Sequence, residues 1–154
     1  MVKEILKGLA LTFQQMWKKP ITLQYPEERK LMPARARGRH QLQRYEVGME
    51  RCIGCGLCSA VCPSNCITVV PAENAEEDRH SPGERYSQIY RINEFRCIFC
   101  GYCQEACPVD AIILTEEYEF SAYSRDEFVY DKERLLVSLS RQPQGADRSP
   151  EPIS

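Results

Sequence analysis

Residues 51–63 read RCIGCGLCSAVCP, and residues 96–108 read RCIFCGYCQEACP. The second stretch is the first displaced by 45 residues, so that four cysteines, an internal glycine and a closing Cys-Pro pair recur at equivalent places. Outside the stretch, Tyr45 and Ile67 fall on Tyr90 and Ile112. An internal repeat of this kind indicates two copies of one supersecondary unit, related by a pseudo-two-fold axis.

Each copy has the spacing C-x2-C-x2-C-x3-C-P, which predicts a [4Fe–4S] cluster. Three thiolates on one tight loop can converge on three irons of a cube. Structural zinc usually takes pairs of C-x2-4-C knuckles separated by a spacer, and this pattern fits poorly. A disulfide framework is disfavoured by the odd count of nine cysteines and by the absence of a secretory signal, which predicts a reducing compartment.

The fourth cysteine of each copy determines how the clusters are shared. In two-cluster ferredoxins it ligates the cluster of the other motif, and the same crossing is expected here. Cluster one is then predicted to take Cys52, Cys55, Cys58 and Cys107. Cluster two is predicted to take Cys97, Cys100, Cys103 and Cys62. The crossing would tie the two copies together and hold the clusters close to each other.

The fold class expected from this pattern is α+β, with a two-[4Fe–4S] ferredoxin-like domain over residues 45–115. Strands are predicted at Ile67–Val70, Arg85–Ile92 and Ile112–Leu114. The polar stretch 71–84 is predicted to be a surface loop. Residues 116–137 carry several aromatic side chains and are expected to form a packing extension. Residues 138–154 are expected to be a disordered tail.

The N-terminal part predicts an attachment region. Residues 2–17 predict an amphipathic helix, and 1–19 are expected to lie on a membrane surface, on a partner protein, or on both. The apolar stripe consists of Val2, Ile5, Leu6, Leu9, Phe13 and Met16. Residues 20–44 are broken by prolines and rich in arginine, and predict an extended segment that wraps a partner. Residues 1–51 hold 11 Lys and Arg against 5 Asp and Glu.

The remaining candidates are expected to be ordinary. Cys66 aligns with Ala111, so it is predicted to be a small buried residue near cluster one rather than a ligand. His40 and His80 have no ligand spacing. No nucleic-acid module accompanies the arginines, so nucleic-acid binding is not expected. No phosphate loop or nucleophile–base arrangement is present, so no catalytic residue is assigned and this chain alone is not expected to carry out NADH or quinone chemistry.

Segments outside the cysteine motifs resemble a known family. Thr22–Glu28 (TLQYPEE), Arg37–Leu42 (RGRHQL) and the motif-two stretch together resemble subunit I of bacterial NADH–quinone oxidoreductase, the TYKY-type subunit of respiratory complex I. Ala36 departs from the large aromatic residue usual in that family. The resemblance implies an electron-relay subunit between the NADH/FMN side and the quinone site of a proton-translocating complex.

The resemblance also implies partners and a location. The partners would be the neighbouring subunits before and after this one in the cluster chain. The location would be peripheral, on the cytoplasmic side of the cell inner membrane. Two alternatives stay open: a ferredoxin-like subunit of a related membrane hydrogenase or other quinone-linked complex, and a soluble two-cluster ferredoxin.

Overall fold

The structure is a computed structural model that describes residues 2–33 and 35–137. The chain divides into two compact units, residues 1–32 and residues 33–154, which are described separately. The expected disordered tail at 138–154 lies outside the described residues. The domain boundaries inferred from the sequence remain predictions.

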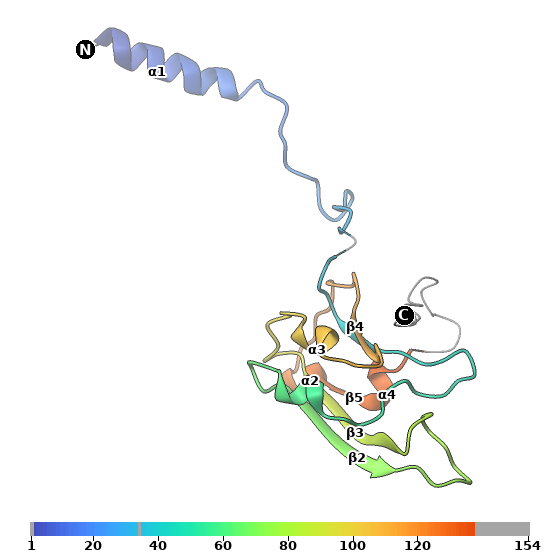
Figure 1. Ribbon diagram of the computed structural model, residues 1–154. Coiled ribbons are helices and arrows are strands. Elements are labelled where there is room, and N and C mark those ends of the chain that lie inside the picture. Colours follow the sequence, from blue (N-terminus) through green and yellow to red (C-terminus); the bar gives the residue numbers. More distant parts are fainter. Residues whose placement is uncertain (1, 34, 138–154) are drawn as a thin grey trace, which may run out of the picture. The chain divides into compact units, whose positions relative to one another are not determined.

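The first unit contains the helix α1 (Val2–Gln15), which confirms the predicted amphipathic helix (Figure 1). The residues of the predicted apolar stripe are all exposed, from 59% for Phe13 to 71% for Val2 and for Met16, which directly follows the helix. Beyond the helix, the Trp17 ring packs edge-on against Phe13, with centroids 6.4 Å apart. Among the described residues, no helix combines the length and the apolar character that a membrane span requires.

The second unit holds the remaining elements, in a mixed α and β arrangement that agrees with the expected fold class. In chain order these are β1 (His40–Leu42), α2 (Leu57–Ala60), β2 (Ile67–Glu73), β3 (Arg85–Asn93), α3 (Tyr102–Glu105), β4 (Ile112–Leu114), the 3-10 helix η1 (Arg125–Phe128), β5 (Val129–Asp131) and α4 (Lys132–Leu135). The short helices α2 and α3 each sit inside one cysteine motif and contact each other (Figure 1).

Strand pairing exchanges the two copies. β1 precedes motif one and pairs antiparallel with β4, which follows motif two. β3 precedes motif two and pairs antiparallel with β2, which follows motif one. Swapping the copies therefore turns one pairing into the other, as a pseudo-two-fold relation requires. β5 adds a third strand beside β3.

Two strands differ from the sequence-based expectation. β2 runs to Glu73, three residues into the predicted loop, with a register shift between Val70 and Pro71. Proline is tolerated there because β2 lies at the edge of its sheet and has a neighbouring strand on one side only. An N–H group missing from its other side costs no hydrogen bond between strands. β1 lies inside a segment expected to be irregular. The sequence does not predict this strand because three residues are too few to produce a recognisable period.

β1 is held in place through the backbone. The N–H groups of Gly38 and Arg39 donate to the carbonyls of Thr115 and Glu117, each over 2.7 Å. A side chain at Gly38 would collide with those same carbonyls. The Arg-Gly-Arg-His segment therefore belongs to the folded unit and is not a free wrapping strand.

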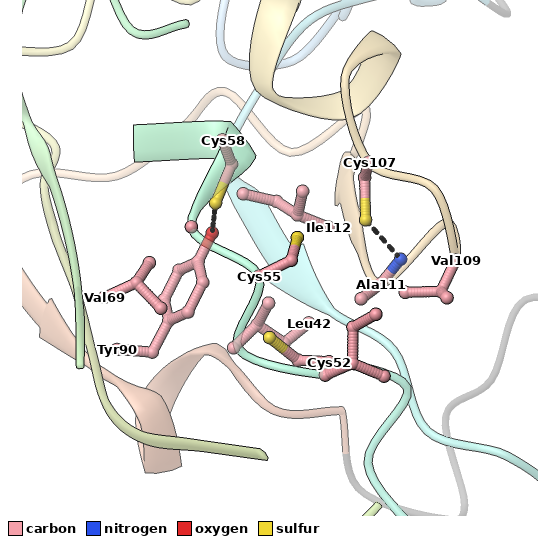
Figure 2. A pocket seen from close by; sticks show the side chains of 12 residues that line it. Leu42, Cys52, Cys55, Cys58, Val69, Tyr90, Cys107, Val109, Ala111 and Ile112 are labelled. Carbon is pink, nitrogen blue, oxygen red and sulfur yellow. Dashed lines mark hydrogen bonds between the residues drawn. The ribbon is translucent and has the colours of Figure 1, made fainter. Parts of the chain in front are cut away.

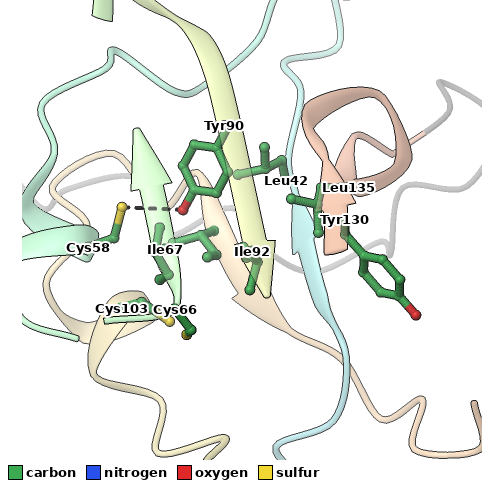
Figure 3. Packing of buried hydrophobic residues seen from close by; sticks show 10 residues of the cluster. Leu42, Cys58, Cys66, Ile67, Tyr90, Ile92, Cys103, Tyr130 and Leu135 are labelled. Carbon is green, nitrogen blue, oxygen red and sulfur yellow. Dashed lines mark hydrogen bonds between the residues drawn. The ribbon is translucent and has the colours of Figure 1, made fainter. Parts of the chain in front are cut away.

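The buried core sits between the strands and α4. Tyr90, Ile92, Leu42 and Leu135 are each at most 2% exposed and gather in one cluster (Figure 3). Cys58, Cys66 and Cys103 belong to the same cluster, so the apolar core continues into the cysteine motifs.

The expectation that aromatic side chains after residue 115 act as packing anchors is only partly correct. Tyr130 is buried and Phe120 lies against Phe99 and Phe128, but Tyr118 and Tyr123 are exposed.

Candidate metal centres

The first cysteine-lined pocket gathers residues from both motifs. Cys52, Cys55 and Cys58 reach it from motif one, and Cys107 reaches it from the end of motif two (Figure 2). The rest of its lining is apolar apart from Tyr90, with contributions from Leu42, Val69, Val109, Ala111 and Ile112. These four cysteines are the set predicted for cluster one.

The second pocket repeats the exchange. It is lined by Cys97, Cys100 and Cys103 of motif two and by Cys62 of motif one, the set predicted for cluster two. The remaining lining includes two side chains that could also ligate a metal, His40 and Cys66. The structure thus brings together each predicted group of four and separates the eight cysteines into two sites.

The loops that present the cysteines share an unusual backbone. Residues with positive φ recur at the repeat spacing of 45 residues: Gly54 (65°) with Phe99 (52°), Gly56 (75°) with Gly101 (86°), and Asn65 (48°) with Asp110 (47°). Left-handed conformations cost little for glycine and are tolerated by asparagine and aspartate. Phe99 is the exception, and its ring packs beside the His40 ring with centroids 5.7 Å apart.

These backbone turns aim N–H groups at sulfur. The N–H of Phe99 donates to Cys97 Sγ over 3.3 Å. The N–H of Cys66 donates to Cys62 Sγ at a distance of 3.5 Å, and the N–H of Ala111 donates to Cys107 Sγ at 3.2 Å. These two bonds are one repeat apart, so the fourth cysteine of each motif accepts from an equivalent backbone N–H group. Such bonds stabilise thiolate charge and tune the potential of a bound cluster.

The residues present fit a [4Fe–4S] group at both pockets. The first pocket offers four cysteine sulfurs, the second offers four motif cysteines together with Cys66, and all nine cysteines are free thiols. Soft thiolate ligands select Cu(I), zinc or iron–sulfur clusters. Two sets of four, with three members of each set on one tight loop, favour the clusters.

Cys66 lies beside the second pocket rather than near cluster one, which corrects the sequence-based expectation. Its Sγ is 3.4 Å from Cys62 Sγ, and the residue is 5% exposed. The repeat relates Cys66 only to Ala111, and the alignment therefore could not place its side chain. The shared i, i+4 spacing with Cys62 was the available signal.

Sequence reasoning missed the buried pair His40 and Glu94. Their side chains are only 1% and 0% exposed, and His40 Nδ1 lies 2.9 Å from Glu94 Oε1. His40 Nε2 lies 3.9 Å from Cys97 Sγ. Burial by itself would lower the pKa of His40, but hydrogen bonds with Cys103 and Glu94 outweigh it and raise the pKa to about 10.

His40, Glu94 and Cys97 could also be read as a three-ligand metal site, because their ligand atoms all lie within 4.8 Å of one another. That reading would remove Cys97 from the triplet that motif two presents on its loop. The triplet recurs in motif one, where this trio has no counterpart. The [4Fe–4S] reading therefore accounts for more of the site.

Tyr90 is the corresponding polar neighbour of the first pocket. Its phenol oxygen lies 3.2 Å from Cys58 Sγ (Figure 2). Burial raises the pKa of the Cys58 thiol to about 11, although the Tyr90 hydrogen bond acts in the opposite direction. A thiol in this position binds metal with loss of its proton, so metal binding and proton release are coupled.

The fold and the two pockets define the class of two-cluster iron–sulfur proteins. A family model described as a 4Fe-4S dicluster domain matches residues 51–111, which include all eight motif cysteines. The NADH-quinone oxidoreductase subunit I 1 of Symbiobacterium thermophilum is 47% identical over 144 residues, covering 94% of this chain and 87% of that protein. The chain belongs to the NADH-quinone oxidoreductase subunit I family and carries two [4Fe–4S] clusters.

A solved structure shows the same fold in a related assembly. It is a chain from the membrane-bound sulfane sulfur reductase, described as an archaeal respiratory membrane complex, with 28% identity and a TM-score of 0.53. The match covers 76% of this chain and 55% of that chain. The chain therefore spans about half the length of that structural relative.

Proposed function

We propose that this chain relays single electrons within a membrane-bound NADH–quinone oxidoreductase, from the NADH/FMN side towards the quinone site. The observation that carries the proposal is the pair of four-cysteine pockets in a chain of the subunit I family. Two sites built from the same short motifs lie in one small folded unit, which suits stepwise electron transfer.

The ligands proposed for cluster one are Cys52, Cys55, Cys58 and Cys107. Those proposed for cluster two are Cys97, Cys100, Cys103 and Cys62. The grouping of these cysteines around two separate pockets supports the crossed assignment. When bound, each cluster supplies one-electron chemistry.

The chain's own residues hold the thiolates, donate N–H groups to them and place apolar side chains beside them. The donors are those of Phe99, Cys66 and Ala111. The apolar walls of the first pocket, among them Leu42, Val69 and Ile112, lower the local polarity. Within the described residues we assign no side chain to NADH or quinone chemistry, so those steps are placed on other subunits.

The proposed location is peripheral, on the cytoplasmic side of the cell inner membrane. Residues 1–19 would attach the chain to the membrane surface and to neighbouring subunits. The exposed apolar stripe of α1 supports this, since it is not covered within its own unit. Lys3, Lys7, Lys18 and Lys19 would add attraction to anionic lipid headgroups.

A related quinone-linked or hydrogenase-like membrane complex is the second candidate. The structural likeness to a subunit of the sulfane sulfur reductase complex favours it, because the same fold serves there in a respiratory assembly with a different name and substrate. The cysteine chemistry would be identical, and only the partners would differ. A soluble two-cluster ferredoxin is less well supported, because it would need neither α1 nor the basic segment.

The experiment that tests the proposal is gentle affinity purification of the full chain from solubilised membranes, followed by mass spectrometry of its partners. We expect a flavin-containing NADH-binding subunit together with antiporter-like membrane subunits. Hydrogenase subunits would support the second candidate. Recovery of the chain alone, at its own native size, would overturn both and leave a soluble carrier.

A further inference from the structure

The two pockets differ most in the buried polar group beside them. At the second pocket, the His40 ring stands between a carboxyl and a cysteine, 2.9 Å from Glu94 Oε1 on one side and 3.9 Å from Cys97 Sγ on the other. His40 and Glu94 are each only 3% exposed. The repeat relation does not require such a pair, so it calls for an explanation of its own.

We propose that His40, held in position by Glu94, donates its Nε2–H to Cys97 and thereby raises the reduction potential of cluster two relative to cluster one. The proposal rests on the proposed assignment of Cys97 to cluster two. His40 is a positioning residue for the charge around the cluster and not a ligand.

The orientation of the ring follows from its contacts. Because Glu94 engages Nδ1, the nitrogen left for the cysteines of the second pocket is Nε2, which lies 3.9 Å from Cys97 Sγ. Cys103 of the same pocket also interacts with the His40 ring. A cysteine that holds a cluster is a thiolate and has no proton to donate. A hydrogen bond between His40 and the cluster-bound Cys97 is therefore donated by Nε2–H.

The buried carboxyl group of Glu94 depends on His40 for its side-chain hydrogen bond. Its Oε2 is buried and has no hydrogen-bond partner among the described residues, whereas Oε1 meets the imidazole. A second-sphere carboxyl that fixes a histidine ring is a common arrangement around protein metal centres. Here it would fix the direction of an N–H group towards sulfur.

The expected sign follows from charge. Reduction adds an electron to the cluster, so a hydrogen-bond donor directed at a ligand sulfur stabilises the reduced form more than the oxidised form. The potential rises as a result. The effect is strengthened by burial, because a low local dielectric screens the donor less than water would.

The first pocket lacks this arrangement. A shift of 45 residues relates Glu94 to Met49 and His40 to Arg85, and Arg85 is exposed. Cluster one has the neutral phenol of Tyr90 instead, 3.2 Å from Cys58 Sγ. Loss of His40 should therefore change one cluster and leave the other unchanged, which makes each cluster an internal control for the other.

The test is an EPR-monitored redox titration of the intact complex containing His40→Leu, with the two clusters followed separately. We expect the ratio of reduced to oxidised cluster two to fall about tenfold at a given potential, equal to about 59 mV for a one-electron couple. Cluster one should change less than twofold. His80→Leu, at a partly exposed loop histidine, is the matched control and should change neither cluster.

Glu94→Leu distinguishes a positioning role from a simple charge effect. If Glu94 acts only as a nearby negative charge, its removal raises the potential of cluster two. If it acts through His40, its removal lowers that potential, and the double variant with His40→Leu falls no further than His40→Leu alone. A rise, or additive effects, would overturn the proposed role of Glu94.

Three results would overturn the proposal for His40: an unchanged cluster-two potential, an equal shift of both clusters, or loss of cluster two in both His40→Leu and His40→Gln. If cluster two is lost in His40→Leu alone, His40→Gln decides, because its amide N–H can still donate and should keep the potential nearer to that of the unsubstituted protein. Absence of two cluster signals from the unsubstituted chain would instead overturn the proposed function.

Discussion

The two repeats agree in backbone but differ in what surrounds their cysteines. Positive-φ residues, short helices and N–H donors to the fourth cysteine all recur 45 residues apart. The neighbouring polar groups do not recur: Tyr90 lies beside the first pocket, whereas His40 and Glu94 lie beside the second. Each loop presents three of the four cysteines of its pocket and the other motif supplies the fourth, while strands from elsewhere in the chain supply the polar neighbours.

The largest expected effect concerns the crossing between repeats. In the double variant Cys62→Ala with Cys66→Ala, cluster two should be lost and cluster one retained, because Cys62 leaves motif one to serve the second pocket. Cys66 is removed as well because its Sγ lies 3.4 Å from Cys62 Sγ and could take its place. Cluster-resolved EPR with iron analysis measures the outcome.

Cys66→Ala alone is the control and should keep both clusters, because the residue has only alanine as its repeat counterpart. If the double variant instead lost the cluster held by Cys52, Cys55 and Cys58, the crossed assignment would be wrong.

Alanine variants of two glycines in motif one separate the cost of backbone strain from the cost of a steric clash. Gly54 and Gly56 both have positive φ, so alanine at either should cost about 1–2 kcal/mol. A Cβ at Gly54 would also lie 2.7 Å from the Tyr86 carbonyl oxygen, whereas a Cβ at Gly56 would meet nothing within 4 Å. Gly54→Ala should therefore destabilise the protein more.

The measurement for these two variants is the loss of cluster absorbance in a denaturant series. Equal midpoints for the two variants would show that the contact with the β3 backbone carries no weight.

A smaller effect is expected at the first pocket. Tyr90→Phe removes the O–H group that lies 3.2 Å from Cys58 Sγ while keeping the ring in the core. One hydrogen bond is worth about 1 kcal/mol, so the potential of cluster one should fall modestly and that of cluster two should stay unchanged. A redox titration that showed the larger change at cluster two would contradict the placement of Tyr90.

Changes in the N-terminal unit are expected to affect the two clusters least. Deletion of residues 1–19 should leave both clusters formed and weaken attachment to the membrane fraction, because the apolar stripe of α1 is removed. Leu9→Glu should act in the same direction, whereas Gln14→Glu adds the same charge off the stripe and should matter less. Full retention of the truncated chain in membranes would contradict a role in attachment.

Much of the site was predictable because its geometry is local. The spacing of cysteines within thirteen residues determines which three thiolates share a loop. The crossed ligation known from two-cluster ferredoxins supplied the fourth member of each predicted group. The strands after each motif were also predictable from short apolar runs such as Ile112–Leu114, which β4 matches. β1 was missed because His40–Leu42 is too short for a periodic signal and is a strand only through its pairing with β4.

The class of cofactor follows from the spacing of the cysteines within each motif, and the family follows from short segments such as Thr22–Glu28 and Arg37–Leu42. Which side chains surround each predicted cluster depends on how distant parts of the chain fold together. His40 and Glu94 are 54 residues apart and meet because β1 and the end of β3 converge on motif two. Contacts between such distant residues depend on strand pairing and burial, so the local spacing of residues does not predict them.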